Sequence, residues 1–207
     1  MKIANRPLAN LTTITLVAFL LSSCAEFNKS GVGTFLGLTF GDKNTNPIKV
    51  GPRNPPFLAP TLSEFYEIDF PNLEFDFVGV ALTKNSDSAK KAGITFKKEG
   101  LVWGAFFSNT RTCGQAEFDK TINYIKKNWK VTHHSESTVN VENSQIKVLT
   151  ASLLSDQVFW RVECFETSQV LEIQDFSVLE ASSTAEGKNA VRKIWNDLKE
   201  IASRKMT

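Results

Sequence analysis

Apolar and polar side chains alternate along residues 62–77, with a break at Pro71-Asn72. Alternation with a period of two is typical of strands that bury one face of a sheet. The segment therefore predicts two strands whose apolar side chains point the same way: Tyr66, Ile68, Phe70, Leu73, Phe75 and Phe77.

Residues 93–107 predict a β-hairpin that turns at Lys98-Glu99-Gly100. The second arm, residues 101–107, is apolar at nearly every position rather than at every second one. A strand of that kind is covered on both faces, so we expect this arm to lie in the middle of the sheet.

A helix is predicted to follow, because Thr112 and Gln115 have the spacing of a capping box. Acidic residues sit near its beginning and lysines near its end, as the helix dipole favours. Its apolar side chains recur with helical spacing: Phe118, Ile122, Ile125 and Trp129.

Four further strands are expected over residues 131–141, 145–154, 158–166 and 169–179. Short polar turns join them, and short turns connect antiparallel neighbours. A second amphipathic helix is predicted at about 184–205. We interpret its basic face as solvated, with contact to anionic lipid headgroups as the alternative.

This order of elements predicts an α+β fold, in which two amphipathic helices pack on an antiparallel sheet of about six or seven strands. In element order, residues 62–207 resemble the PsbP-like α-β-α sandwich, a fold also found in small bacterial lipoproteins of the DcrB-like kind. The resemblance rests on no sequence motif and transfers no functional residue. It implies at most a binding or assembly role.

The N-terminus carries the pattern of a bacterial lipoprotein signal. Lys2 and Arg6 precede an apolar run at residues 11–21, which as a helix spans only about 16 Å and is too short for a bilayer. The following Leu21-Ser22-Ser23-Cys24 resembles the lipobox, although Ser23 stands where Gly or Ala is commoner. The resemblance implies cleavage before Cys24, its acylation, and a lipid anchor in the cell envelope.

An uncleaved anchor and an ordinary secretory signal are the alternatives at this N-terminus. Ala25 rather than Asp follows the cysteine. In an enterobacterium-like host with two membranes, this favours the outer membrane, with the protein facing the periplasm.

The domain prediction has three parts: a cleaved signal at 1–23, a lipidated linker at 24–60 and one α+β domain at 61–207. Five of the seven prolines lie within residues 47–60, where they disfavour helices and central strands. If flexible, the linker would reach roughly 30–35 Å. Gly33, Gly37 and Gly41 recur at every fourth position. They indicate either a helix-packing pattern or a loop that packs apolar side chains on the domain or the headgroups.

The charge balance excludes one class of partner. The sequence has 24 basic and 22 acidic residues, and removal of Lys2 and Arg6 with the signal would leave 22 of each. Affinity for nucleic acid requires clustered and uncompensated cations, so we expect no nucleic-acid partner.

Cys113 and Cys164 remain after lipidation of Cys24, in a compartment that should be oxidising. An even pair predicts a disulfide, which would close a loop of about 50 residues and stabilise by roughly 4 kcal/mol. The alternative is a redox-active Cys113 at a helix N-terminus, although no CxxC motif accompanies it.

No catalytic or cofactor-binding motif is recognisable: HExxH, GxSxG, GxGxxG and P-loop spacings do not occur. Glu163, Glu166 and Asp175 form no recognisable pair. His133 and His134 are neighbours on a predicted strand and would point to opposite faces, which disfavours a shared metal ion. We therefore predict no catalytic residues, no cofactor and no metal.

The sequence thus favours a non-enzymatic, membrane-tethered lipoprotein that binds an envelope protein or a small apolar ligand. Most of its 16 Phe and 4 Trp residues fall on core positions, with a carbohydrate- or lipid-binding groove as the alternative. An envelope hydrolase with an unrecognised site is a second hypothesis. A structural or secretion-assembly component that uses residues 25–60 as an interaction strand is a third.

Overall fold

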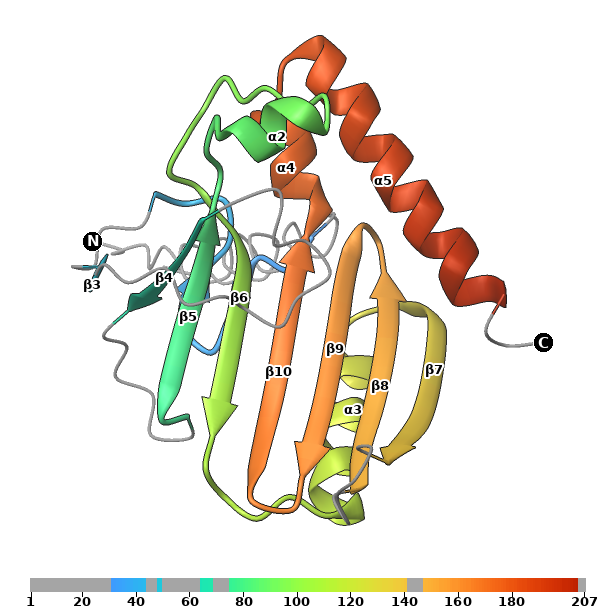
Figure 1. The fold of residues 1–207 in the computed structure, drawn as a ribbon. Helices are drawn as coiled ribbons and strands as arrows, with labels where there is room; N and C mark the ends of the chain where they lie inside the picture. The colour runs from blue at the N-terminus through green and yellow to red at the C-terminus, as the bar shows by residue number, and fades with distance from the viewer. Residues whose placement is uncertain (1–30, 44–47, 50–63, 69–74, 141–146, 205–207) are drawn as a thin grey trace, which may run out of the picture. The chain divides into compact units, whose positions relative to one another are not determined.

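Among the residues that the structure describes, eight strands form the main sheet, and each strand pairs antiparallel to its neighbours (Figure 1). A separate two-stranded hairpin precedes them in the chain. In sheet order the strands are β3 (Ile48–Lys49), β4 (Glu64–Ile68), β5 (Phe77–Leu82), β6 (Val102–Asn109), β10 (Ser168–Asp175), β9 (Val158–Phe165), β8 (Lys147–Ser155) and β7 (Val131–Asn140).

The computed structural model describes residues 31–43, 48–49, 64–68, 75–140 and 147–204. The predicted signal, Cys24 and the stretch 50–63 lie outside these ranges. The remaining elements are the hairpin strands β1 (Thr34–Phe35) and β2 (Leu38–Thr39), and the helices α2 (Asp87–Lys91), α3 (Gln115–Asn128), α4 (Phe176–Ser182) and α5 (Ala185–Arg204).

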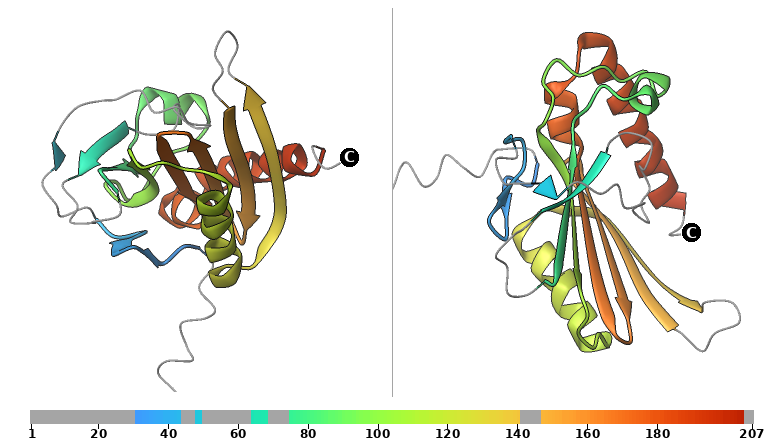
Figure 2. Two further views of the ribbon diagram at one scale, coloured as in Figure 1. Left: turned by 90° about the horizontal axis from the view of Figure 1, so that it is seen from below. Right: turned by 60° about the vertical axis from the view of Figure 1, so that its left-hand side comes forward.

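The α+β class predicted from the sequence is confirmed. Helix α3 and the β1–β2 hairpin lie on one face of the sheet, whereas α5 lies on the other side (Figure 2). The face under α3 is apolar, as the buried row Phe107, Leu171, Val162 and Ala151 across β6, β10, β9 and β8 shows.

Helix α3 forms as its apolar spacing predicts, with Phe118, Ile122 and Ile125 buried. Its beginning differs from the prediction, because Gly114 rather than Thr112 is the N-cap. The backbone N–H of Gly114 donates to Glu117 Oε2 over 3.1 Å, which gives the first turn a side-chain acceptor.

The four-strand meander β7–β10 and helix α5 are also confirmed, with one correction at their junction. The strand predicted at 169–179 ends at Asp175, which caps the short helix α4 by accepting from the N–H groups of Ser177 and Val178. A local side-chain acceptor of this kind ends a strand and begins a helix without any change in hydrophobic period.

The predicted hairpin over 93–107 is wrong in its first arm. Strand β6 is buried and central as expected, but its partners are β5 and β10. Residues 93–100 instead follow α2 as a loop, whose buried Phe96 forms an isolated bridge with Ser183. The apolar side chains of this loop are buried in the core, which explains why the segment looked like a strand.

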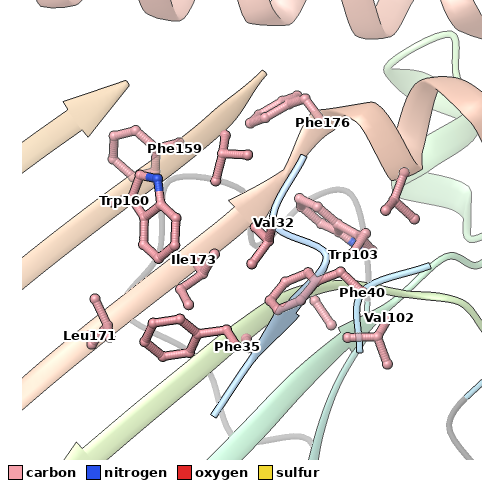
Figure 3. Close-up of a cluster of buried hydrophobic side chains, with 14 of the residues drawn as sticks. Val32, Phe35, Phe40, Val102, Trp103, Phe159, Trp160, Leu171, Ile173 and Phe176 are labelled. Carbon is pink, nitrogen blue, oxygen red and sulfur yellow. The ribbon is translucent and has the colours of Figure 1, made fainter. Parts of the chain in front are cut away.

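The predicted boundary of the domain is also wrong, because the folded unit begins at Gly31 rather than at residue 61. We call residues 31–43 the N-terminal strap. Val32, Phe35, Leu38 and Phe40 of the strap are buried in the same core as the sheet (Figure 3).

Backbone hydrogen bonds fasten the strap at both ends. The N–H of Val32 donates to the buried carboxylate of Asp175 over 2.7 Å. At the other end, Gly41 N–H donates to Val102 O and Val102 N–H donates to Asp42 O. This part of the predicted linker therefore belongs to the domain, and it is not a free interaction strand.

The glycines of the strap have a conformational role. Gly33, Gly37 and Gly41 all have positive φ, which favours glycine and is incompatible with a helix. Of the two interpretations of their spacing, the loop that packs apolar side chains on the domain is confirmed and the helix-packing pattern is wrong.

Candidate functional site

A groove lies between the strap, helix α3 and one end of strands β6 and β10, with a volume of about 430 Å³. That size falls within the range of small-molecule sites, roughly 300–1,000 Å³. Its apolar lining consists of Phe35, Leu36, Phe75, Tyr124, Ile125 and Leu171.

Aromatic rings shape the wall of this groove. Phe35 of the strap packs on Tyr124 of α3, with ring centroids 6.2 Å apart, and is itself buried against Phe107 and Trp160. Tyr124 is 47% exposed, although it is one of the large hydrophobic side chains of the domain. The groove thus presents an aromatic surface to solvent beside a rigid aromatic core.

The polar lining includes two cations, Arg111 and Lys120, and one carboxylate, Glu117, and the charge of Arg111 also interacts with Asp76 beside the groove. Glu117 is already engaged by the N-terminus of α3. The remaining polar residues are Asn109, Thr112, Thr121 and Gln169, of which Gln169 Nε2 donates to Thr121 Oγ1 over 2.7 Å.

Asp76 stabilises the loop next to the groove by accepting from both the N–H and the hydroxyl of Thr110 over 2.7 Å. These hydrogen bonds, helped by the charge of Arg111, lower the pKa of Asp76. They tie the residues just before β5, where Phe75 lines the groove, to the loop before α3.

The two cysteines expected to pair do so, because Cys113 and Cys164 form a disulfide with Cα atoms 5.4 Å apart. The bond joins the loop ahead of α3 to strand β9. It thereby holds the helix that forms one wall of the groove against the sheet.

His133 and His134 lie on β7 as predicted, at consecutive positions paired with Leu154 and Leu153. His134 Nε2 lies 2.8 Å from Glu136 Oε1, and partial burial together with the charge of Lys126 lowers the pKa of His134. His133 Nδ1 contacts the Thr132 hydroxyl at 3.1 Å.

The three carboxylates singled out in the sequence are not brought together. Glu163 pairs with Arg161 within β9, Glu166 lies in the turn between β9 and β10, and Asp175 lies at the far end of β10. Strand β10 separates Glu166 from Asp175 by its whole length.

Burial raises the pKa of Asp175, against the lowering effect of the hydrogen bonds from Ser177, Val32 and Val178. This carboxyl has a structural role, because those bonds link α4 to the strap.

The structure instead reveals a buried pair of polar residues that the sequence did not indicate. Glu172 and Gln174 of β10 are each 2% exposed, and Gln174 Nε2 donates to Glu172 Oε1. Burial raises the pKa of Glu172 to about 8, although the hydrogen bond from Gln174 and the charge of Arg161 lower it. Alternation along β10 places both residues on the face away from α3, where a sequence pattern indicates solvent rather than burial.

Comparisons with known proteins identify no relative: no protein-family model, no curated protein and no solved structure matches this chain. Among the residues that the structure describes, no helix is long and apolar enough to cross a membrane. Within the same ranges, no group of three or more His, Cys, Asp or Glu side chains is arranged to hold a metal ion.

Proposed function

We propose that this protein is a lipid-anchored component of a bacterial envelope, and that its domain binds a small anionic amphiphile without catalysing a reaction. The groove between the strap and α3 is the observation that carries the binding function. The anchor rests on the N-terminal sequence.

The lining of the groove favours a ligand with an apolar body and a negative group. Aromatic and aliphatic side chains offer the apolar contact surface, and burial of such surface contributes about 25 cal/mol per Å². Lys120 lies at the rim beside Glu117, a carboxylate that the first turn of α3 already engages, so a carboxylate, sulfonate or phosphate would be attracted to Lys120.

The anchor and the groove are close in sequence. Residues 25–30 alone separate Cys24 from the first residue of the folded unit, a stretch that spans at most about 20 Å when extended. Phe35 and Leu36 of the groove lie shortly after it. A lipidated Cys24 would therefore keep the groove near the membrane surface, where amphiphiles are concentrated.

Binding is tested with a dansyl-labelled undecanoic acid, whose fluorescence increases on entering an apolar site. We expect saturable binding that Tyr124→Ala and Lys120→Glu each weaken about tenfold, equivalent to roughly 1.4 kcal/mol. Lys126→Glu is the matched control, because it makes the same charge change on the same helix without lining the groove. The absence of saturable binding, or equal loss in the control, would reject the ligand class.

The anchor is tested separately by Cys24→Ser in a bacterial host. We expect the wild-type chain in the membrane fraction and the variant in the soluble fraction, because two or three acyl chains give durable membrane binding. Intact mass of the mature wild-type protein should show cleavage before Cys24 and the added lipid. A variant that stays equally membrane-bound would contradict the anchor.

A further inference from the structure

Strand β7 (Val131–Asn140) forms one edge of the main sheet among the residues that the structure describes. Within those residues it pairs with β8, which leaves the backbone groups on its other side without a partner strand. The strand at the opposite edge, β3, has two residues, whereas β7 has ten. Of the two edges, β7 therefore offers the longer row of backbone donors and acceptors to a further strand.

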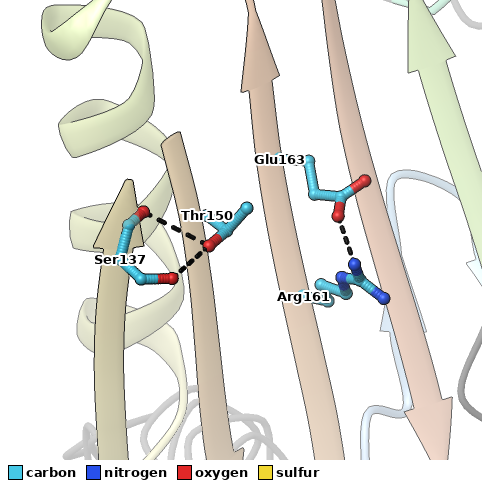
Figure 4. A network of polar contacts seen from close by, with 4 residues as sticks. All are labelled: Ser137, Thr150, Arg161 and Glu163. Atoms are coloured by element: carbon cyan, nitrogen blue, oxygen red, sulfur yellow. Dashed lines mark hydrogen bonds and ion pairs between the residues drawn. The ribbon is translucent and has the colours of Figure 1, made fainter. Parts of the chain in front are cut away.

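The contact with β8 shows which backbone groups of β7 point outward. The Thr150 hydroxyl of β8 donates to the carbonyl oxygen of Ser137 over 3.2 Å and lies 2.7 Å from the Ser137 hydroxyl (Figure 4). The backbone of Ser137 therefore points towards β8. Because this direction alternates along a strand, Ser135 also points its backbone groups to β8, whereas His134 and Glu136 point theirs to the open side.

The features that normally keep a sheet edge from pairing are sparse on β7. Long edges are usually blocked by lysine, proline, a bulge or an inward-pointing charge. Strand β7 contains neither lysine nor proline, and its shift in register lies at its beginning, between Val131 and His133. From His133 onward the strand is therefore regular and suited to pairing.

The sequence of β7 is complementary to itself in antiparallel orientation. If Ser135 lies on a two-fold axis, His134 of each copy faces Glu136 of the other, and His133 faces Ser137. A basic side chain then stands opposite an acidic one in both halves of the interface. A two-fold axis at Glu136 would instead place two carboxylates directly opposite each other, which is destabilising.

Two exposed apolar side chains support a second copy as the partner. Val139 of β7 is 48% exposed and Ile201 of α5 is 54% exposed, and neither lines the amphiphile groove. Glu136 is paired with Ala151, which belongs to the face under α3, so alternation places Val139 on the opposite face. That is the side of the sheet on which α5 lies (Figure 2).

Helix α5 reaches the edge of the sheet near the start of β7. Thr132 of β7 and Trp195 of α5 line the same pocket, and the end of α5 extends past β7 in Figure 1. In the register centred on Ser135, Val139 of one copy lies opposite the beginning of the other copy's β7. Each Val139 is thereby brought towards the end of α5 that carries Ile201, which would shield both side chains from water.

We propose that β7 pairs with β7 of a second copy of this chain, antiparallel about a two-fold axis at Ser135. The two main sheets then form one continuous sheet, in which the outward N–H and C=O groups of His134 and Glu136 bond between the copies. Ser135 and its counterpart form a pair without hydrogen bonds, whose Cα atoms lie about 4.5 Å apart. No residue of β7 lines the amphiphile groove, so either proposal can fail without the other.

The register is tested by cysteine cross-linking of the full chain in membranes of a bacterial host, read on a non-reducing gel. Ser135→Cys should form a covalent dimer, because a disulfide needs Cα atoms about 4.4–6.8 Å apart. Ser137→Cys is the matched control on the same strand and face, since its two copies would lie roughly 13 Å apart. The wild-type chain, with Cys24 but no cysteine on β7, gives the baseline.

Sedimentation of the detergent-solubilised full chain measures the association without a new cysteine. We expect a dimer whose dissociation constant Glu136→Lys raises at least tenfold, because the lysine would face His134 of the other copy. Glu166→Lys makes the same charge change in the turn between β9 and β10 and should leave the dimer unchanged. Circular dichroism verifies that each variant is folded.

Three results would overturn the proposal. The first is a wild-type chain that sediments as a monomer. The second is a Glu136→Lys variant that dimerises as tightly as the wild type, and the third is cross-linking of Ser137→Cys in place of Ser135→Cys.

Discussion

The pKa of Glu172 depends strongly on the position of this residue in the fold. Glu172 lies on strand β10, which is flanked by β6 and β9, and it is almost fully buried. Desolvation disfavours its charged form and raises its pKa from 4.5 to about 8. At neutral pH the folded protein therefore holds a proton on Glu172 that the unfolded chain releases.

That difference predicts a pH-dependent stability. Between pH 4.5 and 8 the native state binds more protons than the unfolded state, so the free energy of unfolding falls as pH rises through this window. The loss contributed by Glu172 is at most about 5 kcal/mol above pH 8. Glu172→Gln, which is neutral and similar in shape, should remove this part of the slope.

Urea denaturation of both proteins at pH 5, 7 and 9 measures the effect. The variant should gain stability relative to the wild type at pH 9 and little at pH 5. The same series for Glu163→Gln serves as a comparison, because Glu163 pairs with Arg161. Parallel curves for the wild type and Glu172→Gln would contradict the assigned protonation.

At the scale of elements, the strap decides how the groove and the core are built. Its β1–β2 hairpin places Phe35 against Trp129, the C-cap residue of α3, and against Trp160 of the sheet, with ring centroids about 5.8 and 5.7 Å away. Its hydrogen bond from Val32 to Asp175 crosses 143 positions of sequence. A segment that composition classes as a linker thus closes one end of the core.

We predict that Phe35→Ala lowers the free energy of unfolding by about 3–5 kcal/mol, because it leaves a cavity among four aromatic neighbours. Thr34→Ala is the matched control, since Thr34 is its exposed neighbour in the same strand. That control should change stability by less than about 0.5 kcal/mol. Equal stability of both variants in chemical denaturation would mean that the strap does not pack in solution.

At the scale of the whole molecule, one covalent bond joins the parts that form the groove. The Cys113–Cys164 disulfide links the loop before α3 to β9 across a sequence separation of 51. Such a closed loop restricts the unfolded chain and stabilises the fold by roughly 4 kcal/mol.

The double variant Cys113→Ser, Cys164→Ser should therefore unfold at a temperature roughly 10 °C lower than the wild type. A reducing agent should lower the unfolding temperature of the wild type by a similar amount and leave the variant unchanged. If the reducing agent has no effect on the wild type, the bond contributes nothing to stability.

The sequence alone predicts well those features whose cause is local. The periodicity of Phe118, Ile122 and Ile125 specifies α3 wherever the helix packs, and short polar turns specify the antiparallel meander. The disulfide was predictable for a different reason, because two cysteines are expected to pair in an oxidising compartment. The lipobox stays a prediction, because Cys24 lies outside the described residues.

Tertiary structure alone decides the features that depend on distant partners. Alternation along β10 predicts that Glu172 faces solvent, yet its side chain is buried. In the same way, the glycines of the strap do not indicate that the strap packs on the main sheet. The strap depends on contacts between segments more than 100 positions apart, such as Val32 with Asp175, and Glu172 lies between two neighbouring strands, β6 and β9. Hydrophobic periodicity reports which side of an element is apolar, but the partner of that side is selected by the packing of the entire chain.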